Sequence, residues 1–225
     1  MTTGRISSPE ELEHAVSELG FLPFFENGIP GFSLEERTPD ELWFKEGVDG
    51  PWEWKGPVAR SKVCAYGKLF SGKAGFVSLE WFPELVNYRR KGYDFDLRYE
   101  DGLVGLKDKQ IYDAIQKHGS MLTKGLKAYC GFGKTGQKGF DSVITRLQMQ
   151  TYIVVADCED MRDMYGRPYG WGVARYTTPE ALFGEDTVTA AYHRKPEESR
   201  ARILEHLTGL LPGADADKLE KLIRG

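Results

Sequence analysis

Long hydrophobic runs are absent from this chain of 225 residues, which contains no stretch of about 18 consecutive apolar side chains. A membrane-spanning helix is therefore not expected. The first residues, MTTGRISSPEELEH, also lack the basic and then apolar order of a signal peptide. With 40% hydrophobic residues and a mean hydropathy of −0.46, the composition is typical of a globular protein. We expect a soluble protein of the cytoplasm that has no membrane partner.

Cysteine and histidine are also scarce. Cys64, Cys130 and Cys158 lie far apart without a C-x-x-C pair, which favours reduced thiols over a disulfide framework. None of the four histidines belongs to an H-E-x-x-H motif or to a Cys/His cluster, and no G-x-S-x-G motif is present. A zinc site and a serine hydrolase are therefore not predicted, and no cofactor is expected.

Neither sign of charge is in large excess, because 30 Lys and Arg stand against 34 Asp and Glu. This balance argues against a protein coated in positive charge for sequence-blind binding of nucleic acid. The charge is nevertheless unevenly distributed, since residues 104–150 contain eight basic and three acidic side chains. A local charge of +5 is thus embedded in a remainder of −9. Such a segment is either a phosphate-binding surface or a solvated face.

The N-terminal part begins with the signals of a helix and continues with many aromatic residues. Ser8 is a candidate N-cap, Pro9 suits the first helical position and Gly20 suits the end of the helix. Residues 21–99 then contain 17 of the 28 aromatic residues of the chain. This density predicts a compact module held together by large flat side chains. The same side chains also suit a pocket for a planar ligand such as a base, and both uses stay open.

The pattern changes near residue 104 to three short helices followed by two strands. Apolar side chains recur at helical spacing from Leu106 to Ile115, from Met121 to Tyr129 behind Ser120 as a cap, and from Phe140 to Leu147. Two β-branched runs follow, over residues 151–157 and 171–177, and predict a hairpin. The order predicts an α+β fold with a winged helix-turn-helix core. In that architecture the third helix lies in the DNA major groove.

We divide the chain on this basis into three parts. They are an aromatic-rich N-terminal module over residues 1–103, a winged helix over residues 104–178 and C-terminal helices over residues 179–225. Thr178 and Pro179 suit the start of the last part. Its apolar stripe is predicted to pack back onto the body, and it comprises Ile203, Leu204, Leu207, Leu210 and Leu211.

One short motif resembles a phosphate-binding P-loop but lies in the wrong context. Residues 128–135, AYCGFGKT, satisfy a permissive version of the pattern. A P-loop requires a buried strand before it and a helix that starts at the Lys-Thr pair. Here an amphipathic helix precedes the motif, and Gly136 and Gly139 stand where the next helix would begin. A nucleotide cofactor is therefore not predicted, and the segment is interpreted as a flexible basic turn.

Side chains suited to contacting DNA lie around the third helix and in the hairpin loop. Glycines interleaved with Lys134 and Lys138 allow backbone and ammonium groups to approach a phosphate. Several positions on the third helix are not needed for the core, and an arginine there is able to make bidentate contacts with guanine. The hairpin loop carries two arginines among acidic residues. The predicted DNA-binding set comprises Lys134, Lys138, Ser142, Thr145, Arg146, Arg162 and Arg167.

Several phrases of the sequence are similar to a bacterial protein family. They are FLPF at 21–24, IPGF at 29–32, PWEWK at 51–55, AGFVS at 74–78, GSMLT at 119–123 and YGRPYGW at 165–171. These phrases resemble the AlkZ-related proteins, and the likeness spans residues 10–177. That family is linked distantly to winged-helix DNA glycosylases, which excise alkylated bases and unhook interstrand crosslinks. The resemblance therefore implies a role in DNA repair.

The resemblance also implies candidate catalytic residues. The glycosylases carry a Gln-x-Gln motif thought to position the attacking water, and this chain contains Gln148-Met149-Gln150. Two amides at i and i+2 reach one water only where the backbone is extended. Excision would require the damaged base to leave the duplex. Candidate stacking partners for it are Trp52, Trp54 and Trp81.

The sequence thus predicts a DNA-binding protein whose partner is double-stranded DNA, with excision of alkylated bases as the implied activity. Whether it is an enzyme stays open. The alternative is a winged helix that serves as a structural or protein-interaction unit without binding DNA, as the negative total charge favours.

Overall fold

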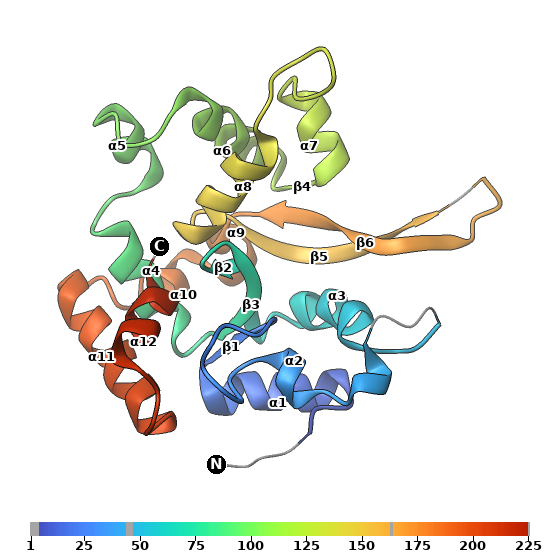
Figure 1. Cartoon of the computed structure of the whole chain (residues 1–225). Coiled ribbons are helices and arrows are strands. Elements are labelled where there is room, and N and C mark those ends of the chain that lie inside the picture. The colour runs from blue at the N-terminus through green and yellow to red at the C-terminus, as the bar shows by residue number, and fades with distance from the viewer. Residues whose placement is uncertain (1–4, 44–46, 163, 225) are drawn as a thin grey trace.

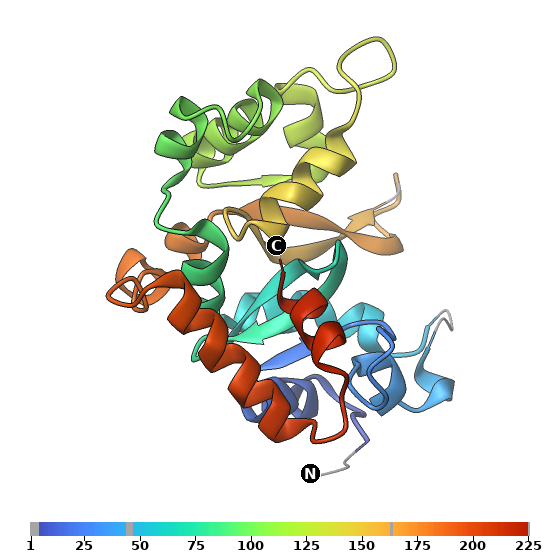
Figure 2. The same cartoon turned by 60° about the vertical axis from the view of Figure 1, so that its left-hand side comes forward.

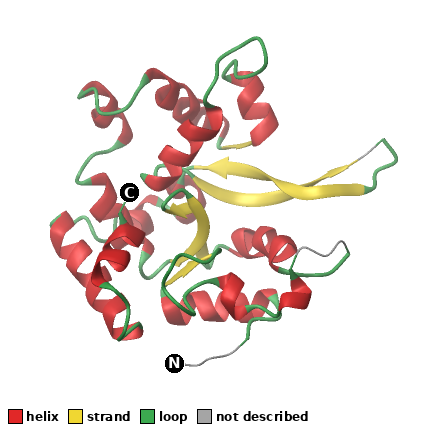
Figure 3. Ribbon diagram, in the orientation of Figure 1, coloured by secondary structure: helices red, strands yellow, loops and turns green. Residues whose placement is uncertain are grey.

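The computed structural model describes residues 5–43, 47–162 and 164–224, and it leaves the side chains of residues 161, 162 and 168–171 undescribed. Helices pack around two small antiparallel sheets, the second of which extends away from them as a long hairpin (Figures 1 and 3). The N-terminal elements are α1 (Pro9–Leu19), β1 (Phe21–Pro23), α2 (Leu34–Arg37), a 3-10 helix η1 (Asp40–Leu42), α3 (Pro51–Ser61), β2 (Cys64–Phe70), β3 (Lys73–Ser78), α4 (Phe82–Arg90) and α5 (Phe95–Glu100). The middle elements are α6 (Leu106–His118), β4 (Ser120–Leu122), α7 (Thr123–Tyr129), α8 (Phe140–Met149), β5 (Val154–Arg162) and β6 (Pro168–Thr177). The last are α9 (Pro179–Phe183), α10 (Glu185–Val188), α11 (Pro196–Leu210) and α12 (Ala216–Ile223).

The first helix begins and ends where its sequence signals predict. Ser8 Oγ accepts a hydrogen bond from the Glu11 amide at 3.2 Å, and the Glu11 carboxylate accepts one from the Ser7 amide. At the other end the Gly20 amide donates to the Val16 carbonyl, and Gly20 has a φ of 74°. Both ends of α1 therefore satisfy backbone groups that a helix terminus leaves without partners.

The first sheet, in the order β1-β3-β2, separates two cores. Because side chains alternate along a strand, neighbouring residues face opposite sides. Leu22, Tyr66 and Phe76 lie in the first core, which includes α1, α3 and the middle helices. Phe21 and Val77 lie in the second core, with α4, α11 and α12. The sheet thus joins segments from both ends of the chain.

The aromatic residues of the N-terminal part pack mainly against one another. The ring of Phe24 lies 5.5 Å from that of Trp43, 5.4 Å from that of Trp52 and 6.3 Å from that of Phe76. Trp54 is fully buried. Of the two uses that the sequence left open, the structure therefore supports the core.

The second sheet has the order β4-β6-β5, in which β4 lies between α6 and α7 in the chain and β5 and β6 follow α8. The predicted hairpin is confirmed, and β5 and β6 project from the body (Figure 1). The predicted second helix is corrected, because Ser120, Met121 and Leu122 form a strand and α7 begins only at Thr123. Met121 pairs with Tyr176, so pairing with β6 satisfies backbone groups that a helix would otherwise use.

The C-terminal helices cover the second core, as their apolar stripe predicts. Ile203, Leu207 and Leu211 are buried there together with Leu219 and Leu222. Figure 2 shows α11 and α12 lying along one side of the molecule. In the described parts of the chain, no helix is both long and apolar enough to cross a bilayer.

Candidate nucleic-acid interface

The segment between α7 and α8, residues 130–139, is a folded turn. Phe132 is buried, and its ring meets that of Phe140 edge-on at 5.3 Å. The Gln137 amide donates to the Gly131 carbonyl, and Gln137 Nε2 donates to the Cys130 carbonyl. A buried ring and a bonded amide therefore flank Gly133 and Gly136 within the turn.

Three lysines are linked through side-chain to backbone hydrogen bonds at this turn and are called the α8 lysine cluster, namely Lys107, Lys134 and Lys138. Lys138 Nζ donates to the Gly133 carbonyl at 2.8 Å and to the Lys134 carbonyl at 2.5 Å. Lys107 Nζ donates to the Lys138 carbonyl at 2.8 Å. All three lysines are exposed, and none forms an ion pair with a carboxylate of the described residues. The cluster is therefore a local positive charge at the start of α8.

The three acidic residues of the basic segment, residues 104–150, form ion pairs with cations outside the α8 lysine cluster. Asp113 lies 2.5 Å from Lys109, and Asp141 lies 3.3 Å from Lys127. Asp108 holds Arg146, which was predicted to contact DNA. Its carboxylate accepts from Arg146 Nε and from Nη2, both at 2.8 Å.

The two side chains of the Asp108–Arg146 ion pair differ in their exposure to solvent. The Asp108 side chain is 2% exposed and that of Arg146 is 45% exposed. This bidentate bond raises the pKa of Arg146. Arg146 therefore ties α8 to α6, which leaves only part of its guanidinium for another partner.

The exposed face of α8 is bounded on one side by the β2-β3 hairpin. Lys68 Nζ of β2 donates to Thr145 Oγ1 at 3.1 Å, and the Gly72 amide contacts Met149 Sδ at 3.1 Å. Ser142 remains exposed. The N-terminal half of α8 is thus accessible, while its C-terminal half is partly covered. Lys68 was missed by sequence reasoning because it lies 77 residues from Thr145.

The β5-β6 hairpin carries the two predicted arginines at its end. The side chain of Arg162 lies outside the described residues. Arg167 is exposed in the turn, and its guanidinium carbon lies 5.1 Å from the centroid of the Tyr165 ring. Met164 is 88% exposed and Tyr165 is 73% exposed. The turn thus presents a cation beside exposed flat and apolar groups.

The acidic residues of the hairpin are partly neutralised. Arg60 lies 2.5 Å from Asp157, and Arg175 lies 2.5 Å from Glu159. These pairs weaken the repulsion between the acidic residues of the hairpin and a phosphate backbone.

The two candidate catalytic glutamines are not brought together. Gln148 is fully buried, where its Oε1 accepts from the Lys68 amide at 2.9 Å and its Nε2 donates to the Ile144 carbonyl. Gln150 caps α8 with φ −82° and ψ 3°. Because this backbone is not extended, the two amides diverge and line different cavities. The condition for sharing one water is not met.

Gln148 lines a cavity of about 180 Å³ between α3, β2 and the β5-β6 hairpin. Burial lowers the pKa of Lys55 and raises that of Cys158 to about 11 and that of Tyr176 to about 12. The thiol and the phenol are therefore protonated at neutral pH. The cavity offers hydrogen-bond donors and aromatic rings but no thiolate.

The tryptophans proposed to stack on a flipped base do not line this cavity. Trp54 is buried in the first core and Trp52 packs against that core. Trp81 stacks on His206 with ring centroids 4.1 Å apart. Each of the three rings therefore already contacts other parts of the fold.

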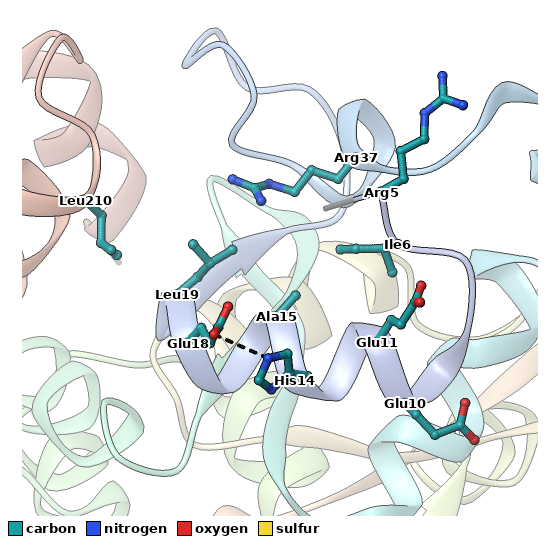
Figure 4. A pocket seen from close by; sticks show the side chains of 10 residues that line it. All are labelled: Arg5, Ile6, Glu10, Glu11, His14, Ala15, Glu18, Leu19, Arg37 and Leu210. Carbon is teal, nitrogen blue, oxygen red and sulfur yellow. Dashed lines mark ion pairs between the residues drawn. The ribbon is translucent and has the colours of Figure 1, made fainter. Parts of the chain in front are cut away.

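A further cavity of about 640 Å³ lies along α1 (Figure 4). Ile6, Leu19 and Leu210 give it an apolar lining, and His14 forms a 3.3 Å pair with Glu18 at its rim. It contains none of the predicted site residues.

A comparison with models of known protein families identifies the family of this chain. The model of the family described as AlkZ related matches residues 6–224. This chain belongs to the AlkZ-related family. Comparisons of this AlkZ-related protein with curated proteins and with solved structures found no match. Among its described residues, no group of three or more His, Cys, Asp and Glu side chains is arranged to hold a metal ion.

Proposed function

We propose that this AlkZ-related protein binds double-stranded DNA through the N-terminal half of α8 and acts in DNA repair. The observation that carries the proposal is the α8 lysine cluster, which is exposed and unneutralised at the start of an accessible helix. Recognition helices contact bases through their N-terminal residues, and nearby lysines contact phosphates. Ser142, Thr145 and the remaining donors of Arg146 are the base-facing candidates.

The winged helix over residues 104–178 is part of this proposal. Its support is the element order α6, β4, α7, α8, β5, β6, together with the sheet order β4-β6-β5. In such a unit the hairpin flanks the third helix, so Arg162 and Arg167 are candidates for contacts with the DNA backbone. The boundaries at residues 103 and 178 remain predictions.

Binding to duplex DNA as a function of salt concentration tests the proposal. Each phosphate contact contributes about 0.9 to the slope of log affinity against log salt. Replacing Lys134 and Lys138 by Ala is expected to flatten that slope by about 2. A matched control is the pair Lys62→Asn and Lys195→Ala, which removes two exposed cations elsewhere. The control is expected to leave the slope close to that of the unchanged protein.

The competing function is a structural or protein-binding unit, which the negative total charge favours. Absence of duplex binding at low salt would eliminate the DNA proposal in favour of this one. A slope that falls equally in the control pair would show that only total charge matters.

Excision of alkylated bases is the repair activity that we propose on the basis of family membership. Gln148 and Gln150 remain its predicted catalytic residues, acting separately because they line different cavities. The test is release of alkylated base by the unchanged protein, Gln148→Ala and Gln150→Ala, with unfolding measured in parallel. Equal release by all three would remove both glutamines from the chemistry.

A further inference from the structure

A second cationic site lies at the C-terminal end of α8, apart from the lysine cluster at its start. It is a cavity of about 180 Å³ between α4, α5, the end of α8 and the end of α12. Its lining comprises Tyr88, Arg89, Lys91, Arg98, Gln150 and Arg224. Four of these six side chains are cationic, and no carboxylate of the described residues lines the cavity. We call it the Arg89 cavity.

Arg89 supplies a buried positive charge whose partners are neutral. It is 5% exposed, and its guanidinium donates to the carbonyls of Leu69, Met149 and Ile223 at 2.7 to 3.0 Å. Burial lowers the pKa of Arg89 to about 9. Carbonyl dipoles satisfy its donors without cancelling its charge, so an anion nearby is stabilising.

One carboxylate of α9 and one of α12 are committed to other cations. Glu180 lies 2.5 Å from Arg90, the neighbour of Arg89 on α4. Glu220 of α12 makes two hydrogen bonds to Arg200. The positive charge of the Arg89 cavity is therefore not balanced by either of these acids.

Arg98 and Arg224 also line the cavity, beside the buried Arg89. Arginines bind phosphate oxygens through their planar fork.

The volume limits the size of the ligand. Pockets for drug-sized molecules are typically about 300 to 1,000 Å³, whereas this cavity is smaller. It suits a single tetrahedral group rather than a whole nucleotide.

We propose that the Arg89 cavity binds a phosphate group, either free inorganic phosphate or the terminal monoester of a DNA strand. The site is independent of the DNA contact proposed for the start of α8. A phosphodiester carries only one charge, so it matches the cationic cavity less well than a dianionic monoester does.

Calorimetric titration with sodium phosphate, with chloride replacing phosphate to hold ionic strength constant, tests this site. The unchanged protein is expected to bind one phosphate saturably. Arg98→Gln is expected to weaken phosphate binding about tenfold or more. Arg224→Gln is a second variant, chosen because the Arg224 side chain is exposed and its removal spares the fold.

Two controls separate this proposal from the previous one. Lys62→Asn removes an exposed cation outside the cavity and is expected to bind phosphate as the unchanged protein does. The Lys134→Ala and Lys138→Ala double variant is also expected to keep its phosphate affinity, whatever its effect on duplex binding. No saturable phosphate binding, or unchanged binding in both arginine variants, would overturn the proposal.

Competition identifies the source of the phosphate group. A short single strand with a 5′-phosphate that displaces inorganic phosphate supports a terminal monoester, and its failure to do so supports the free ion. Equal displacement by the same strand without the phosphate would overturn the assignment, because a phosphodiester would then be the ligand.

Discussion

Arg146 is held by a partner 38 residues away in sequence, and this changes its role. The sequence places it on the solvent face of the third helix as a reader of bases. In the structure its fork binds Asp108, which also accepts from the Gly105 amide at the start of α6. A bidentate pair of this kind fixes geometry, so Arg146 first positions α8 and only then offers its remaining donors.

Removing Arg146 therefore leaves a buried carboxylate without its partner. We expect Arg146→Ala to lower the free energy of unfolding by about 2 kcal/mol, measured by urea denaturation. Lys127→Ala is the matched control, because its partner Asp141 is 81% exposed. That change is expected to cost below about 0.5 kcal/mol. Equal losses in the two variants would contradict the structural role of Arg146.

The buried thiol of Cys64 predicts how the free energy of unfolding changes at alkaline pH. Burial raises the pKa of Cys64 from 9.0 to about 12. Between these values the unfolded chain loses the proton and the folded chain keeps it, so stability falls as the pH rises. The loss from Cys64 is about 2 kcal/mol between pH 9 and 11.

Chemical denaturation at pH 8 and pH 11 measures this loss. Cys64→Ala is expected to reduce the difference in unfolding free energy between the two pH values. The half-buried Cys130 provides the control, since Cys130→Ala is expected to reduce it less. A Cys64→Ala variant with the full alkaline loss would show that other groups cause it.

Among the elements, the turn before α8 requires a glycine at position 136 because its backbone packs closely there. A Cβ on Gly136 would lie 2.2 Å from the Gly131 carbonyl oxygen, whereas one on Gly133 would meet no atom within 4 Å. The backbone at Gly136 therefore packs directly against the backbone at Gly131, whereas Gly133 faces open space.

Gly136→Ala is expected to lower stability by about 1 to 3 kcal/mol and to displace Lys134 and Lys138. We expect weaker binding of duplex DNA to accompany that loss. Gly133→Ala, the same change in open space, is expected to alter both quantities little. Stability and affinity measured on the pair form the test, and an equally affected Gly133→Ala would reject this account of the turn.

Elements built from local signals were predicted well, and those built from distant pairing were not. The capping residues around α1 and the β-branched runs of β5 and β6 lie within each element, so their patterns are visible in the sequence. The first sheet was missed because β1 is three residues long and pairs with β3 more than fifty residues later. Gly67 and Gly75 also interrupt the apolar pattern of β2 and β3.

In the candidate site too, features that depend on neighbouring residues were predicted and those that depend on distant contacts were not. The exposure of Lys134 and Lys138 was predicted because glycines and polar residues surround them in the chain. The commitment of Arg146 to Asp108, the presence of Lys68 beside Thr145 and the separation of the two glutamines depend on tertiary contacts. No local pattern encodes these.

In the whole molecule, the two cores share the first sheet and are expected to unfold together. Leu207→Ala in the second core is expected to lower stability by about 2 to 5 kcal/mol. Circular dichroism and tryptophan fluorescence are expected to report one common transition. Leu103→Ala, at a side chain that is 51% exposed, is the control and is expected to have little effect. Separate transitions for the two probes would show that the cores are independent.

Arg89 also has a consequence for the order of events during synthesis. One of its acceptors, the Ile223 carbonyl, is made 134 residues after the arginine itself. Until Ile223 leaves the ribosome, the Arg89 guanidinium, which is buried in the folded protein, lacks one of its carbonyl acceptors. The nascent chain is therefore expected to hold its N-terminal half in an incomplete, protease-sensitive form and to close it only after α12 has emerged.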